Sequence, residues 1–71
     1  MTWNYRIIKD GDYYSVCEVF YESKKAVGWS DPITIGGESV EDILKQLEMI
    51  TQDIKNEILE VNGDTLVASK E

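Results

Sequence analysis

The segment 34–42 divides this chain into a half that favours strands and a half that favours one helix. Its two adjacent glycines free the backbone to turn. Ser39 follows them at a position typical of a helix N-cap, where its side chain can accept a hydrogen bond from the amide of Asp42. Acidic residues in the next turn suit the positive pole of a helix. The segment therefore predicts a sheet before it and a helix that begins at Val40.

Two stretches before this boundary, 3–8 and 13–21, are rich in the aromatic and β-branched residues that favour strands. An Asp-Gly pair lies between them, and we expect Asp10 and Gly11 to form the turn of an antiparallel hairpin. Alternation along both strands gathers large side chains on one face. These are Trp3, Tyr5, Ile7, Tyr14, Val16 and Phe20.

A second turn, at Lys24 and Lys25, returns the chain as a third strand and places Trp29 opposite Phe20 on that same face. Pro32 lacks an amide hydrogen, so it ends the ladder, and only a short edge segment is expected after it.

Apolar residues then recur at three- and four-residue steps from Val40 to Ile54, with charged residues on the opposite side. We expect this stripe to pack on the sheet face that carries the aromatic rings. The predicted fold class is α+β: a three-stranded antiparallel sheet, in the order strand, strand, strand, helix, with one amphipathic helix packed on one face.

The end of the chain is compatible with two structures. The apolar stretches 57–61 and 64–67 flank Asn62-Gly63, which favours a second small hairpin, but an isolated hairpin is marginal in water and a frayed tail fits equally well. We expect a single domain over 1–61, with or without this extra strand or hairpin. A hairpin arm or flexible tail follows over 62–71 and is expected to be disordered after about Ala68.

The other face of the first hairpin is also too apolar to lie in solvent alone. Apolar and aromatic patches with an arginine are typical of protein interfaces, so we expect this face to bind protein, with a second copy of the chain as the simplest partner. The predicted contact residues are Ile8, Tyr13, Cys17, Val19, Tyr21 and Arg6. Two alternatives stay open: the C-terminal segment folds over this face, or a register one residue different exchanges the two faces.

Size and charge limit the classes of function. A chain of 71 residues forms one small domain of marginal stability that a partner would help. One cysteine cannot form an internal disulfide, and neither a membrane span nor a signal peptide is evident, so we expect a soluble cytoplasmic protein. A net charge of −7 disfavours direct binding to nucleic acid or membrane. That charge either keeps the protein soluble or complements a basic protein partner.

Catalytic and metal-binding motifs are not evident. The sequence contains no histidine, and Cys17 has no neighbouring base that would activate its thiol. Its two closely spaced acidic pairs fit a turn and a helix start, and they do not supply the ligands of a calcium loop. The pairs are Asp10 with Asp12 and Glu41 with Asp42. We therefore predict a protein that is not an enzyme and that has no cofactor and no metal site.

The aromatic residues allow alternative functions. A pocket lined by Tyr5, Tyr14 and Trp29 would hold a small apolar or aromatic molecule. The rings also resemble a base-stacking platform, but there is no basic stripe to hold the phosphates. A purely structural subunit of a larger assembly is the third alternative.

Two stretches resemble the HicB-like antitoxin fold, a half-ferredoxin fold. They are Asp-Gly-Asp-Tyr-Tyr-Ser-Val at 10–16 and Gly-Glu-Ser-Val-Glu-Asp-Ile-Leu at 37–44. The chain is also similar to short uncharacterised prokaryotic and phage proteins that begin near Trp-Asn-Tyr-Arg, here 3–6, and reach a Gly-Glu-Ser junction before a helix. The resemblance covers about residues 3–55.

In the antitoxin family this domain binds and blocks a small basic RNA-cleaving toxin, while a separate DNA-binding segment, for which this chain has no room, controls transcription. The chain has Asp31-Pro32 and Gly36-Gly37 where the family has a Pro-Gly-Cys-like element. The resemblance implies a compact acidic module that acts by docking. We accordingly expect an inhibitor of a basic nucleic-acid-acting protein, such as a toxin nuclease or a phage-targeted defence enzyme.

Overall fold

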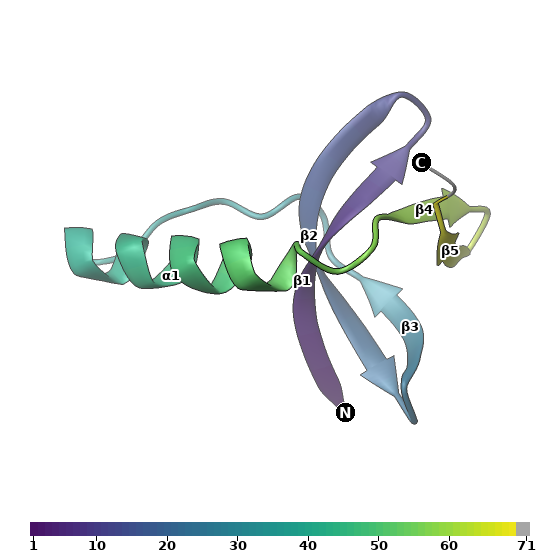
Figure 1. Cartoon of the computed structure of the whole chain (residues 1–71), viewed down its shortest axis with the longest axis horizontal. Helices are drawn as coiled ribbons and strands as arrows, with labels where there is room; N and C mark the ends of the chain where they lie inside the picture. The colour runs from purple at the N-terminus through teal and green to yellow at the C-terminus, as the bar shows by residue number, and fades with distance from the viewer. Residues whose placement is uncertain (70–71) are drawn as a thin grey trace.

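The computed structural model describes residues 1–69, which form five strands and one helix (Figure 1). The elements are β1 (Thr2–Asp10), β2 (Tyr13–Glu22), β3 (Lys25–Trp29), α1 (Val40–Asp53), β4 (Leu59–Asn62) and β5 (Thr65–Ala68). The strands form one sheet in the order β3-β2-β1-β4-β5, in which β1 and β4 run parallel and the other neighbours run antiparallel. The α+β class is confirmed, with a helix that contacts the sheet, but the sheet has five strands and not three.

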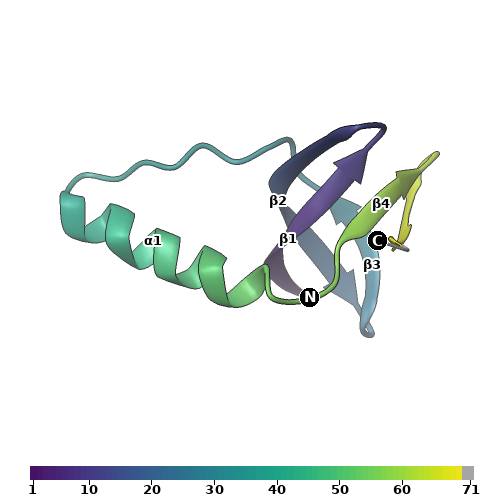
Figure 2. The ribbon, with the colours of Figure 1, turned by 45° about the horizontal axis from the view of Figure 1, so that its top comes forward.

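The sheet curls so that its two edge strands, β3 and β5, come into contact (Figure 2). Its concave side encloses a core whose most buried members are Ile8, Cys17, Val19 and Leu59. Further apolar residues from β2, β3, β4 and β5 pack against them: Tyr21, Ala26, Trp29, Val61 and Leu66. The core therefore lies inside the curled sheet, and α1 lies outside it.

The turn between β1 and β2 uses Gly11 and not Asp10 as its first residue, since Gly11 has a φ of 63°, which favours glycine. Trp3 consequently pairs with Phe20. The predicted Asp10-Gly11 turn would have paired it with Glu18, so the predicted register is wrong by two residues. Because side chains alternate with a period of two, this shift leaves every side chain of β1 and β2 on its predicted face.

The turn between β2 and β3 lies one residue earlier than predicted. Ser23 and Lys24 both have positive φ, 52° and 67°, as the favoured two-residue hairpin turn requires. The pairing then shifts beside Phe20, where β3 has a bulge. Trp29 therefore pairs with Val19 and packs against the inner core, and the prediction that it lies opposite Phe20 is wrong.

The C-terminal segment forms the hairpin that was one of the two expected structures. Gly63 has a φ of 65° in its turn, and β4 pairs with β1, so the sheet continues across the predicted boundary between 1–61 and 62–71. The amide of Ser69 donates to the carbonyl of Ile58 at 2.9 Å, so ordered structure extends past Ala68. The rest of the expected tail, residues 70–71, lies outside the described residues.

Helix α1 begins as the sequence predicts. Ser39 is its N-cap, and the Ser39 hydroxyl accepts a hydrogen bond from the amide of Asp42 at 3.1 Å. The Asp42 carboxylate in turn accepts from the amide of Glu38 at 3.2 Å. These two hydrogen bonds fix the angle at which the chain enters the helix.

Gly37 is needed at this entry because a Cβ atom there would lie 2.6 Å from the Cβ of Asp42. We expect Gly37→Ala to lower the free energy of unfolding by about 1 kcal/mol and to speed amide exchange in the first turn of α1. Gly36→Ala is the matched control, since a Cβ at Gly36 meets nothing within 4 Å. Equal losses in urea denaturation of the two variants would contradict this role for Gly37.

Candidate protein-binding surface

Helix α1 projects from the sheet and does not cover it (Figures 1 and 2). Among the strands it contacts only β1, through its C-terminal turns. Ile50 is buried there, and the Asp53 carboxylate accepts a hydrogen bond from the amide of Tyr5 at 3.0 Å. The predicted packing is thus present at this end of the stripe only, and the first turns of α1 extend beyond the sheet.

The connecting segment, residues 30–39, accompanies the helix outwards. Its amides at Ser30 and Ile33 first donate to carbonyls of β2, each at 2.9 Å, and so continue the edge of the sheet. Beyond this point the segment runs alongside α1, where the Gly36 amide donates to the side chain of Gln46 at 3.2 Å. The helix and this segment therefore form one projecting unit.

Four large apolar side chains of α1 are exposed, and all but Met49 lie on one side of the helix: Val40 (73%), Leu44 (59%) and Leu47 (39%). Their spacing of four and three residues places them in one row, which we call the outer stripe. Ile43 and Ile50, at the neighbouring edge of the apolar face, are half-buried and buried. The apolar face of α1 is thus broader than the surface available to it in this chain.

The polar side of the projecting unit is acidic. Residues 36–53 contain five acidic side chains and a single basic one, a net charge of −4 within the total of −7. The basic residue, Lys45, pairs with Glu41 at 3.5 Å, and both side chains are exposed. Such an exposed pair contributes little to stability, so these charges are available for interactions with another molecule.

The predicted contact residues Ile8, Cys17 and Val19 lie in the core, where each is at most 2% exposed. The prediction that they form an exposed protein-binding surface is wrong. The physical reason is that the sheet curls and that β4 and β5 place Leu59 and Leu66 over this face. This arrangement is the alternative in which the C-terminal segment covers the face.

Arg6, another predicted contact residue, is also buried and holds the fold together. Its guanidinium donates to the carbonyl of Glu57 and, at 2.9 Å, to the hydroxyl of Tyr21. Tyr21 is half-buried and donates to the Asn4 side chain at 2.8 Å. Of the six predicted contact residues only Tyr13 is exposed, at 71%.

A hollow of about 270 Å³ lies between β2, the connecting segment and α1. Its walls include Val16, Ile33, Ile35 and Ile50. The volume lies below the range of about 300–1,000 Å³ typical of small-molecule sites. The predicted pocket of Tyr5, Tyr14 and Trp29 does not form, because Trp29 packs into the inner core while the other two rings lie on the outer face.

Sequence reasoning did not identify the outer stripe as a candidate site, because it expected the whole apolar face of α1 to pack on the sheet. One signal was available. The apolar residues of α1 fall in two rows, Val40-Leu44-Leu47 and Ile43-Ile50-Ile54, which is wide for a helix that meets a sheet along one line.

Comparison with protein-family models, with curated proteins and with solved structures finds no match to this chain. The resemblance to HicB-like antitoxins is therefore still a prediction from the motifs. Across residues 1–69, no helix reaches the length and apolar content needed to span a membrane.

Proposed function

We propose that this chain is a small non-enzymatic protein-binding module and that the acidic side of α1 docks onto a basic partner protein. One observation carries the proposal: more than half of the net negative charge lies on a helix and segment that project away from the sheet. Projection makes these carboxylates accessible to a second molecule. Clustered like charges steer and select a partner of opposite charge.

The specific form of the proposal is an inhibitor of a basic nucleic-acid-acting protein, such as a toxin nuclease or a phage-targeted defence enzyme. Such enzymes hold phosphates with lysine and arginine side chains. Carboxylates such as Glu41 and Glu48, which lie on one side of α1, would occupy those basic groups in place of phosphates. The motif resemblance to antitoxins supports the same form.

Charge reversal on α1 tests the proposal. The immobilised 71-residue chain is used to capture proteins from a host lysate, and the captured basic protein is purified and titrated. We expect Glu41→Lys/Glu48→Lys to weaken its binding by about tenfold or more, and we expect the affinity of the unmodified chain to fall between about 50 and 300 mM salt.

Asp12→Lys/Asp64→Lys is the matched control, because it makes the same change in net charge at the hairpin turns, away from α1. We expect this control to retain binding within about twofold. The proposal fails if both double variants lose the same affinity, if binding does not depend on salt, or if no basic protein binds.

A further inference from the structure

The chain exposes more surface than a folded protein of its mass. A monomer of 8.1 kDa is expected to expose about 4,500 Å². This chain exposes 5303 Å², about 800 Å² more. Its radius of gyration is 12.6 Å, compared with about 11 Å for a compact domain of this length. One partner in a standard interface buries about 800 Å², which equals the excess.

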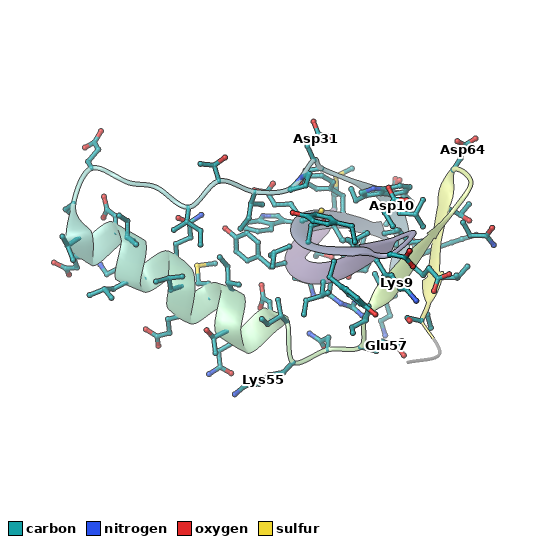
Figure 3. The ribbon with its side chains drawn as sticks, turned by 90° about the horizontal axis from the view of Figure 1, so that it is seen from above. Lys9, Asp10, Asp31, Lys55, Glu57 and Asp64 are labelled. Carbon is teal, nitrogen blue, oxygen red and sulfur yellow. The ribbon has the colours of Figure 1, made fainter. Side chains whose placement is uncertain are left out.

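The projecting unit contributes to this excess because it extends away from the sheet. Seen from above, α1 and the connecting segment extend to one side, whereas the charged residues Asp10 and Asp64 lie at the opposite end of the molecule (Figure 3). The outer stripe is the longest row of exposed apolar side chains on α1, and Ile35 of the connecting segment is also exposed, at 47%. An exposed apolar row of this kind is typical of an interface.

We propose that the outer stripe of α1 binds the same stripe of a second copy of this chain. Its residues Val40, Leu44 and Leu47 have the four-and-three spacing of the seam in a helix pair, and no charged residue interrupts the row. An apolar row of this kind is self-complementary about a two-fold axis. With the axis near Leu44, each Val40 meets Leu47 of the other copy.

The two helices run antiparallel in this dimer. A parallel pair would place the acidic first turns, with Glu41 and Asp42, side by side and would align the two helix dipoles unfavourably. The antiparallel pair separates them. Because the first turns of α1 extend beyond the sheet, the two sheets then lie at opposite ends of the helix pair and do not collide.

This dimer goes beyond the proposed function and is measured without any basic partner. We expect the full chain to sediment at equilibrium as a dimer, twice 8.1 kDa, at tens of micromolar. Leu44→Glu would place a charge in the middle of the seam and raise the dissociation constant by about 100-fold. Met49→Glu is the matched control, since Met49 is 50% exposed on the same helix but lies off the outer stripe, and it should leave the dimer intact.

Disulfide cross-linking tests the proposed dimer even if Leu44→Glu disturbs folding. Two copies of Leu44→Cys lie at the two-fold axis and should form an intermolecular disulfide with a mild oxidant, whereas Met49→Cys should not. The native Cys17 is buried and does not compete. A chain that is monomeric at about 500 µM, equal sedimentation of the two Glu variants, or equal cross-linking of the two Cys variants would overturn the proposal.

Discussion

A Val19→Asp variant is expected to lose the folded state altogether. Val19 has no exposed surface and lies in the core between Asn4 of β1 and Trp29 of β3. An aspartate there would bury a carboxylate with no partner, which costs several kcal/mol. A domain of this size has a total stability of only about 5 kcal/mol. Far-UV circular dichroism and amide NMR spectra would therefore report an unfolded chain.

Val27→Asp is the matched control for this prediction. Val27 lies on β3 and is 52% exposed, so the same change there should alter stability by less than about 0.5 kcal/mol. The two variants also test whether this sheet face is the core or a protein-binding surface. If Val19→Asp folded normally and lost only binding to a partner, the face would be an interaction surface and not the core.

Arg6→Met is expected to lower the free energy of unfolding by about 3 kcal/mol. The Arg6 guanidinium is the link between β1 and the chain that leads into β4, because it donates to the carbonyl of Glu57, from Nε at 3.2 Å. Methionine keeps part of the packing but leaves this carbonyl and the Tyr21 hydroxyl without their donor. Urea denaturation of the variant would measure the loss.

Two further variants check that the effect comes from this hydrogen-bond network. Tyr21→Phe should cost about 1 kcal/mol, and its cost should be smaller in the Arg6→Met background because the two side chains share a hydrogen bond. Lys25→Met removes the same charge from an exposed position on β3 and should have little effect. Equal losses for Arg6→Met and Lys25→Met would contradict the structural role of Arg6.

The features that sequence reasoning predicted correctly depend on local chemistry. The start of α1 follows from Ser39 and the amide that it accepts, three residues away. Alternation of side chains along β1 and β2 decides which residues share a face of the hairpin. The predicted faces were therefore correct although the predicted register was wrong by two residues. The positions of the two turns were predicted less accurately. A glycine, or another residue with positive φ, can occupy either of the two central positions of a hairpin turn.

The features that it missed depend on contacts between distant parts of the chain. Ile8 pairs with Leu59 of β4, and that pairing decides which face of the hairpin is enclosed. An apolar core face and an apolar binding face have the same sequence pattern, so Ile8, Cys17 and Val19 fitted both. The apolar stripe of α1 was predicted correctly. The surface that the stripe packs against depends on the path of the connecting segment, and the sequence pattern does not determine that path.

The parallel pairing of β1 with β4 also determines when the core can close during synthesis. β1 to β3 assemble from neighbouring segments, whereas β4 joins β1 through only two residue pairs and is made after α1. Until Leu59 has left the ribosome, β4 cannot cover the concave side of the nascent sheet, and the apolar side chains on that side stay exposed. The pairing of β4 with β1 is therefore the step that closes the core, and a chain that stalls before β4 is made is the form most prone to aggregate.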